Sequence, residues 1–242
     1  MKKYKLLNLK KVKSTNFELK EILKKKKNIE NLCVSADIQT SGYGRRKTKW
    51  YSYKGNIHIS IFLLPNCSLN KVNQLSFLTS ISIGQTLKKI KKNINFKYKW
   101  PNDIIIEKKK VGGVLIETSS SQNRVKWAIV GIGINIKKYP KLNQNFYKAT
   151  SFFNENIKIN KRIFINLFLK NFFNNYNKWQ INGFNFIKKK WLSNIYKNKN
   201  LIKVKEKNRI ITGKSPSLST NGSLKLNINK KIKEFSFGDQ II

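Results

Sequence analysis

Hydrophobic residues recur along this chain at two different spacings, and the spacing changes from one segment to the next. Alternating or short unbroken apolar runs are typical of strands, whereas apolar positions three and four residues apart are typical of helices. Strands are therefore predicted at residues 5–12, 31–38, 56–64, 95–100, 104–107, 111–118 and 125–136. Helices are predicted from the Ser14-Thr15-Asn16 cap to residue 27, and at residues 69–90, 163–179 and 184–192.

Polar segments between these elements predict turns and loops. Residues 39–53 are basic and glycine-bearing and have no apolar period, which indicates a loop. The three lysines at residues 108–110 separate two apolar runs and predict a tight turn, and residues 139–150 are irregular.

The composition of the chain changes near Tyr196. From Leu201 onward, short β-type runs alternate with turn sequences such as Asn221-Gly222, which favour hairpins. Roughly 45 residues of such short strands predict a small β-barrel. We therefore expect an α/β (α+β) fold in two parts: a mixed-sheet domain over residues 1–195 and a C-terminal β-barrel over residues 196–242.

The overall composition is that of a folded chain. Hydrophobic residues make up 40% of the 242 residues, which is enough to bury a sizeable core. No apolar run approaches the roughly 18 residues that a membrane-spanning helix needs. The basic start of the chain also lacks the apolar stretch of a secretory signal. These features predict a cytoplasmic protein without a membrane partner.

The net charge of +40 is the electrostatic signature of a nucleic-acid-binding protein. Arginine, however, occurs at only five positions, and the lysines are spread along the whole chain among many Asn and Ile residues. Drift in an AT-rich coding sequence produces this pattern without selection for a partner. Weak, salt-sensitive adhesion to polyanions is expected in either case.

Cysteine and histidine are too rare for several kinds of site. The chain has two cysteines and one histidine, so a disulfide framework, a Cys/His zinc site and any chemistry that needs two imidazoles are excluded. His58 lies between Ile57 and Ile59, which indicates a strand histidine rather than a catalytic one.

The loop at residues 41–50 is the first candidate for chemistry. Gly42 and Gly44 let backbone N–H groups approach an anion, and the adjacent Arg45 and Arg46 supply forked donors for phosphate. A solvated basic loop is the simpler alternative.

Three further segments carry candidate residues. Residues 99–103 form a turn in which Asp103 could supply a hard oxygen ligand for Mg²⁺ beside a nucleotide. Glycines at residues 112–113, and at positions 131 and 133, interrupt apolar strands and could let a ligand come close. A bulge or tight sheet packing explains the glycines at positions 131 and 133 equally well.

Together, these segments resemble the biotin–protein ligases in their order and spacing. The C-terminal β module is also similar to the small SH3-like barrel of that family. The matching segments are Ser14-Thr15-Asn16, Gln39 with the loop to Trp50, and residues 99–103, 110–117 and 131–135.

The resemblance implies an activity in two steps. Such ligases join biotin to ATP, giving biotinyl-5′-adenylate and pyrophosphate, and then pass biotin to a lysine of a carrier protein. It further implies Mg²⁺, the biotin carboxyl carrier protein of acetyl-CoA carboxylase as partner, and a possible homodimer. Because the chain begins shortly before Ser14, the similarity is to short members without an N-terminal DNA-binding domain, and we expect no sequence-specific DNA binding.

The resemblance also assigns roles to residues. Lys110, Arg45 and Asp103 are the implied catalytic residues, with Asp103 as a candidate Mg²⁺ ligand. The implied biotin-binding residues are Ser14, Thr15, Asn16, Gln39, Tyr43, Gly44, Arg45, Lys110, Gly112, Gly113, Gly131 and Gly133. The implied ATP-binding residues are Arg45, Arg46, Lys49, Trp50, Lys99, Asn102, Asp103 and Asn135.

The loop departs from the family pattern at one notable position. The family usually has Gly-Arg-Gly-Arg, and here Tyr43 replaces the first arginine, so a guanidinium contact is lost and weaker retention of the adenylate is expected. Lys47 and Thr48 also depart from the usual pair.

Three other functions stay open. The first is a lipoate or octanoyl ligase or transferase of the same fold. The second is a basic nucleic-acid-binding protein with a degenerate ligase fold. The third is a degenerate ligase retained as a binding protein, which the change at Tyr43 suggests.

Overall fold

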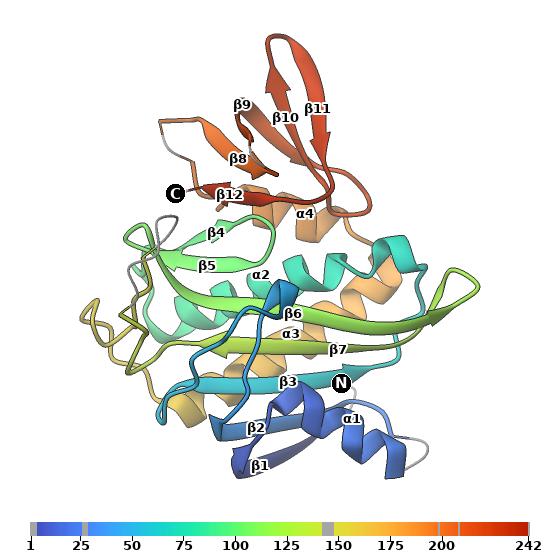
Figure 1. Ribbon diagram of the computed structural model, residues 1–242, viewed down its shortest axis with the longest axis vertical. Helices are drawn as coiled ribbons and strands as arrows, with labels where there is room; N and C mark the ends of the chain where they lie inside the picture. Colours follow the sequence, from blue (N-terminus) through green and yellow to red (C-terminus); the bar gives the residue numbers. More distant parts are fainter. Residues whose placement is uncertain (1–3, 26–28, 142–147, 198, 208, 242) are drawn as a thin grey trace.

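The chain folds into two β-sheets and four α-helices in the computed structural model, which describes residues 4–25, 29–141, 148–197, 199–207 and 209–241 (Figure 1). The larger sheet has seven strands in the order β1-β2-β3-β7-β6-β5-β4. Its strands are β1 (Lys5–Val12), β2 (Leu32–Gln39), β3 (Ile57–Leu63), β4 (Lys97–Lys99), β5 (Asp103–Ile106), β6 (Lys109–Ser121) and β7 (Arg124–Ile134). Only β1 and β2 pair in parallel within this sheet, so the expected mixed sheet is confirmed.

Helices cover both faces of this sheet. Helix α1 (Thr15–Lys25) packs on one face, where Leu19 meets Val34 and Phe62. Helices α2 (Gln74–Ile90) and α3 (Lys161–Asn182) lie on the other face, and α4 (Asn185–Leu192) follows at the end near the second sheet (Figure 1). Because successive strand residues point to opposite faces, this arrangement explains why the central strands are apolar on both sides.

The predicted cap of the first helix is confirmed. The Ser14 hydroxyl accepts a hydrogen bond from the Phe17 N–H (3.1 Å), and the Ser14 carbonyl accepts one from Glu18. This is the geometry of an N-cap, which satisfies a backbone donor that the first helical turn leaves unpaired. The cap fixes the positions of Thr15 and Asn16 directly after it.

Two predicted boundaries are wrong. Residues 69–90 were expected to form one helix, but Leu69–Lys71 forms a 3₁₀ turn and α2 begins at Gln74. The turn expected at residues 108–110 instead lies at Glu107 and Lys108, both with positive φ, and Ile106 pairs directly with Lys109. Lys110 therefore belongs to a strand, where neighbouring strands hold its backbone. Part of the irregular segment at residues 139–150 lies outside the described residues.

The second sheet is the C-terminal β module that the composition change predicts. Its strands are β8 (Ile202–Glu206), β9 (Arg209–Leu218), β10 (Leu224–Ile228), β11 (Lys231–Phe235) and β12 (Asp239–Ile241), paired antiparallel in the order β11-β10-β9-β8-β12. Within the described residues, this pairing does not close into a ring. The expected division at residues 195 and 196 stays a prediction, because one hydrophobic core runs through both sheets.

Gln240 on β12 links the second sheet to the large sheet through side-chain hydrogen bonds. Its side-chain oxygen accepts a hydrogen bond from the Trp100 N–H (2.9 Å), and its side-chain amide donates to the Tyr196 carbonyl (2.6 Å). Gln240 is buried, so both bonds are shielded from water. This contact places the end of the C-terminal sheet beside the turn that precedes β5.

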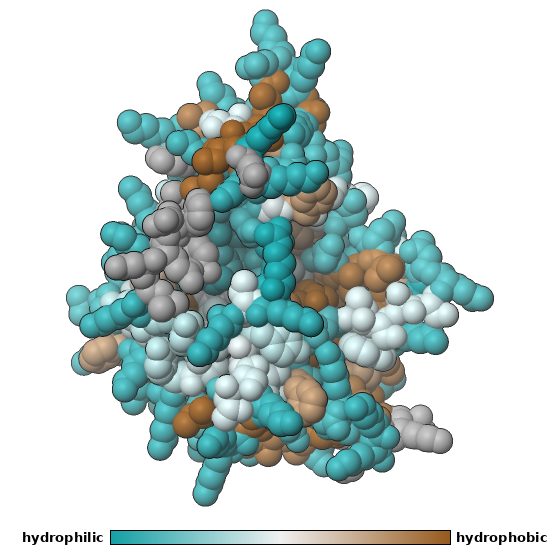
Figure 2. Space-filling model, in the orientation of Figure 1, coloured by the Kyte–Doolittle hydropathy of each residue, from teal (hydrophilic) through white to brown (hydrophobic). Residues whose placement is uncertain are grey.

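The surface is hydrophilic over most of the face in Figure 2. None of the helices in the described part of the chain is long and apolar enough to cross a membrane.

Candidate active site

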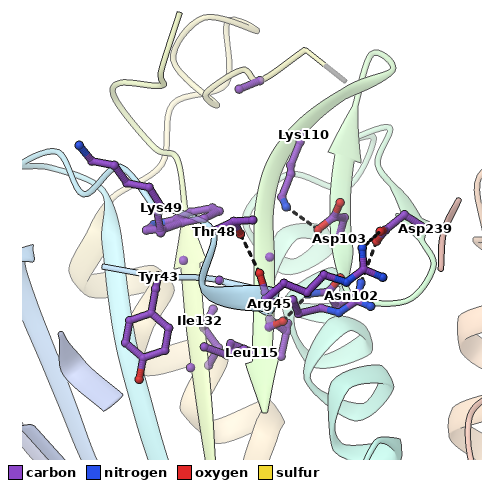
Figure 3. A pocket seen from close by; sticks show the side chains of 18 of the residues that line it. Tyr43, Arg45, Thr48, Lys49, Asn102, Asp103, Lys110, Leu115, Ile132 and Asp239 are labelled. Carbon is purple, nitrogen blue, oxygen red and sulfur yellow. Dashed lines mark hydrogen bonds and ion pairs between the residues drawn. The ribbon is translucent and has the colours of Figure 1, made fainter. Parts of the chain in front are cut away.

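A pocket of about 670 Å³ opens where the start of α1, the loop at residues 42–50, the large sheet and the C-terminal sheet meet (Figure 3). This volume is within the usual range of small-ligand sites. Basic side chains outnumber acidic ones in its lining, so the pocket favours anionic ligands. The basic residues are Arg45, Arg46, Lys49, Lys99, Lys110, Lys205 and Lys207, and the acidic residues are Asp103 and Asp239.

The structure brings almost all the predicted site residues together around this pocket. The lining includes Ser14, Thr15, Asn16, Gln39, Tyr43, Gly44, Arg45, Arg46, Lys49, Trp50, Lys99, Asn102, Asp103, Lys110, Gly113, Gly131, Gly133 and Asn135. Gly112 is the exception. It pairs with Ile134 rather than with Gly133, so it faces the opposite side of the sheet and packs toward the core.

Small residues on three adjacent strands create the hollow in the sheet. Gly133 pairs with Gly113 on β6, and Gly131 pairs with Ser60 on β3. Paired residues of antiparallel strands point to the same face of the sheet. Because three of these four residues are glycines, the sheet has a shallow depression on the side where α1 packs.

The protein's own side chains occupy part of that depression. A Cβ atom added at Gly131 would lie 2.5 Å from Asn16 Oδ1, and one added at Gly133 would lie 2.3 Å from the Trp50 ring. These glycines therefore make room for Asn16 and Trp50. The latter two residues, rather than the glycines, present the wall that a ligand would contact.

Hydrogen bonds among neutral polar groups shape one end of the pocket. Gln39 Oε1 accepts from the Thr15 N–H (2.8 Å), and Gln39 Nε2 donates to Ser52 Oγ (2.8 Å). Ser60 Oγ lies within hydrogen-bond distance of both Thr15 and Asn16. Thr15, Asn16 and Ser60 are all buried, so this end is a rigid group of amide and hydroxyl donors and acceptors.

Two lysines flank a buried carboxylate at the other end of the pocket. Lys110 Nζ lies 2.6 Å from Asp103 Oδ1, and Lys99 Nζ lies 2.9 Å from Asp103 Oδ2. Burial alone would raise the pKa of Asp103, but the two ammonium groups outweigh it and lower this pKa to about 2. The cluster therefore carries one excess positive charge, and Lys110 is its more exposed member, with 17% of its side chain accessible.

The hypothesis that Asp103 binds Mg²⁺ does not fit this geometry. Both carboxylate oxygens already face an ammonium group, so a metal ion would have to displace one of the lysines. No group of three or more potential His, Cys, Asp or Glu ligands occurs among the described residues.

The glycine-arginine loop forms a short arch over the pocket. The Gly44 N–H donates to the Thr48 carbonyl (2.7 Å), and the Trp50 N–H donates to the Gly42 carbonyl (2.9 Å). From the crest of this arch, Arg45 reaches across to the C-terminal sheet and donates to Asp239 Oδ1 at 2.8 Å (Figure 3). The ion pair holds the Arg45 guanidinium against the C-terminal sheet, and Arg45 lines the same pocket as Asp103, Lys99 and Lys110.

The remaining predicted nucleotide residues differ in how they face the pocket. Lys49 extends away from Lys110 and Asp103 and lies over the Tyr51 ring, 4.9 Å from its centroid (Figure 3). Asn135 is buried and donates to the Thr150 carbonyl (3.0 Å), and Asn102 donates to the Val114 carbonyl. These bonds give the two asparagines a fixed orientation.

Several residues that line or adjoin the pocket were not among the predicted site residues. The C-terminal module contributes Lys205, Lys207, Asp239 and Gln240, and this contribution depends on contacts between segments far apart along the chain. The rarity of acids, with Asp+Glu totalling 11, is a signal in the sequence that draws attention to Asp239. Glu117, which ends one of the matched segments, is outside the lining but accepts hydrogen bonds from the lining residues Asn16 and Tyr43.

His58 is a buried strand histidine, as predicted. Its Nδ1 lies 3.4 Å from the Ala36 carbonyl, and it is 1% exposed. Burial lowers the pKa of His58 to about 4, so the imidazole is neutral at pH 7. Cys33 is also buried, and burial raises the pKa of its thiol, which keeps it protonated and unreactive.

Comparison with known proteins identifies the family. Residues 9–135 match the model of the Biotin/lipoate A/B protein ligase family. The bifunctional ligase/repressor BirA of Bacillus subtilis is 33% identical over 214 residues, which cover 87% of this chain and 66% of that protein. The chain thus spans slightly less than two thirds of that relative. The biotin–[acetyl-CoA-carboxylase] ligase of Paracoccus denitrificans is 33% identical over 108 residues, 44% of this chain and 45% of that protein.

Solved structures agree with this relationship. The biotin protein ligase of Aquifex aeolicus, in complex with biotin and ATP, superposes with a TM-score of 0.79 at 30% identity, covering 98% of this chain and 97% of that one. The Leishmania major enzyme with biotinyl-5-AMP shares the fold, with a TM-score of 0.67 at 22% identity, covering 96% and 99%. The chain belongs to the Biotin/lipoate A/B protein ligase family and is homologous to the biotin–protein ligases.

Proposed function

We propose that this protein is an ATP-dependent biotin–protein ligase. It activates biotin as biotinyl-5′-adenylate and transfers the biotinyl group to a lysine of the biotin carboxyl carrier protein of acetyl-CoA carboxylase. The observation that carries this proposal is the division of the pocket into two ends. Neutral amides and hydroxyls form one end, and the cluster of Lys99, Asp103 and Lys110 forms the other.

The neutral end suits the ureido ring of biotin. A ureido group has one carbonyl acceptor and two N–H donors, and the side chains of Thr15, Asn16 and Gln39, which line the pocket, offer matching partners. Trp50 then provides an apolar wall against the sheet at Gly133.

The cationic end suits the first chemical step. In that step a biotin carboxylate oxygen attacks the α-phosphorus of ATP, a new O–P bond forms, and pyrophosphate leaves with the electrons of the broken P–O bond. Two anions must approach each other, so fixed positive charge is needed more than proton transfer. In this proposal Lys110 contacts both the biotin carboxylate and the α-phosphate, and Arg45 and Lys99 line the same pocket and add positive charge.

The second step needs no nucleophile from the enzyme. The amine of the carrier lysine attacks the carbonyl of the mixed anhydride, an amide bond forms, and AMP leaves. A buried, neutral His58 that does not line the pocket is compatible with this chemistry. In this proposal Asn102, Asn135, Arg46 and Trp50 contact the nucleotide. Lys49 is the weakest candidate because its side chain points away from the cationic cluster.

Mg²⁺ would arrive with the triphosphate, whose oxygens, together with water, are its usual ligands. We assign no step to it through Asp103. Homodimer formation and the absence of sequence-specific DNA binding stay predictions.

Biotin-dependent exchange of pyrophosphate into ATP tests the proposal, with lipoate run in parallel. Exchange is expected with biotin and not with lipoate. Lys110→Ala should lower the rate about 100-fold or more, because one preorganised charge is lost. Lys109→Ala is the matched control, since Lys109 is the preceding residue, pairs with Glu155 and lies outside the pocket lining.

Two other outcomes of the exchange experiment would contradict the proposal. Exchange driven by lipoate would make the protein a lipoate ligase. No exchange with either acid, from a sample with a cooperative unfolding transition, would favour a degenerate ligase retained for binding.

A further inference from the structure

Glu117 lies where three elements of the site meet, and the proposed reaction gives it no role. From strand β6 its carboxylate accepts hydrogen bonds from Asn16 Nδ2 (2.7 Å) and from the Tyr43 hydroxyl (2.9 Å). It also forms an ion pair with Lys20 on α1, at 2.7 Å. One acceptor thus joins the helix, the arched loop and the sheet.

The chemistry of a carboxylate fixes the orientation of Asn16. An ionised carboxylate only accepts hydrogen bonds, so Asn16 must turn its amide nitrogen to Glu117 and its oxygen toward Ser60. Burial raises the pKa of Glu117, but the hydrogen bonds from Lys20, Asn16 and Tyr43 lower it overall. Glu117 is therefore ionised at neutral pH.

Tyr43 connects the same carboxylate to the loop. Tyr43 and Arg45 leave the arch in different directions (Figure 3). Arg45 is held by Asp239 on the C-terminal sheet, and Tyr43 is held by Glu117 on the large sheet. The loop is therefore bonded to the C-terminal sheet through Arg45 and to the large sheet through Tyr43.

We propose that Glu117 is a positioning residue that orients Asn16 and, through the Tyr43 hydroxyl, holds the loop closed over bound biotinyl-5′-adenylate. We name the Tyr43–Glu117 contact the latch. This inference rests on the proposed function, because it concerns the intermediate of that reaction. The latch supplies a restraint on the loop at the position where the family's arginine is missing.

The dissociation rate of the intermediate tests the latch. The adenylate is formed on the enzyme from labelled biotin and ATP with Mg²⁺ and is identified by mass spectrometry. Excess unlabelled biotin is then added, and the loss of label from the enzyme gives the dissociation rate. Tyr43→Phe removes a single oxygen atom, so dissociation should become about tenfold faster, as expected for losing a hydrogen bond to a charged group. Tyr43→Arg should restore slow dissociation, because a guanidinium can pair with Glu117.

Two further variants separate a latch from a general structural effect. Tyr53→Phe removes a hydroxyl from a tyrosine that is absent from the pocket lining, and should leave the dissociation rate unchanged. Glu117→Gln should both weaken biotin binding and speed dissociation. Adding Tyr43→Phe to Glu117→Gln should then change the rate less than twofold, because coupled residues are not additive.

The results distinguish failure of the latch from failure of the function. A wild-type chain that forms no adenylate would overturn both proposals. If the wild type forms adenylate, the latch alone is overturned when Tyr43→Phe releases it at the wild-type rate, or when Tyr43→Phe changes only the midpoint of thermal unfolding.

Discussion

At the scale of single residues, the site depends on which charges are compensated and which are not. Burying the charges of Lys99 and Lys110 would cost free energy, and Asp103 compensates one of these two charges. The other charge leaves the cluster with a net positive charge at the pocket. The residue types of this cluster were readable in the sequence. Its pairing was not, because Lys110 reaches Asp103 only through a register shift in β5 and β6 between Ile104 and Ile105.

The single histidine gives a prediction about pH. Burial lowers the pKa of His58 from 6.5 to about 4, so the unfolded chain binds a proton that the folded chain rejects. The free energy of unfolding should therefore fall as the pH drops below 6.5, by about 2 kcal/mol at pH ~5 relative to pH ~7.5.

Because the chain has one histidine, its imidazole proton signal can be followed directly by NMR. The signal of the folded protein should show no titration between pH ~5.5 and ~7.5, while that of the urea-unfolded chain should titrate near the ordinary value. A folded-state midpoint near 6.5 would contradict the buried, neutral assignment.

At the scale of elements, periodicity predicted the strands and helices well because burial on one or both faces dictates it. The apolar row of residues 125–136 predicted β7, and the Ser14 cap predicted the start of α1. Turn positions were less accurate, since Glu107 and Lys108 adopt positive φ without any glycine to indicate it. The role of the glycines also needed the structure: they accommodate Asn16 and Trp50 rather than opening empty space.

The pairing of β6 with β7 makes a prediction about two glycines directly opposite each other. Gly133→Ala would bring a methyl group within 2.3 Å of the Trp50 ring, so it should displace that indole. We expect a loss of about 1–3 kcal/mol in unfolding free energy, as for other overpacked sites. Biotin binding should weaken as well.

Gly113→Ala is the matched control for stability, because its added methyl group would meet Lys110 Cε at an ordinary 3.4 Å. Urea denaturation measures the loss of unfolding free energy, and the intrinsic tryptophan emission reports the displacement of the Trp50 indole. Equal stability loss in both variants would argue that Trp50 does not rest on Gly133.

At the scale of the whole molecule, the pocket belongs to both sheets. Gln240 fixes the C-terminal sheet against Trp100, and Asp239 on the same strand then reaches Arg45. The sequence pattern predicts the C-terminal module but not its place in the site, because the bonded partners are 140 and 194 residues apart along the chain. Contacts at such separation leave no local pattern to read.

The charge of +40 gives a prediction of its own at this scale. If the charge reflects drift rather than a nucleic-acid site, binding to duplex DNA is counterion release alone and depends on salt, not on sequence. Affinity should fall about a thousandfold between roughly 50 and 200 mM salt for any duplex. Fluorescence anisotropy with duplexes of unrelated sequence measures this directly. A single duplex that stays tightly bound at the higher salt concentration would instead require base contacts, and would make DNA recognition a selected function of this protein.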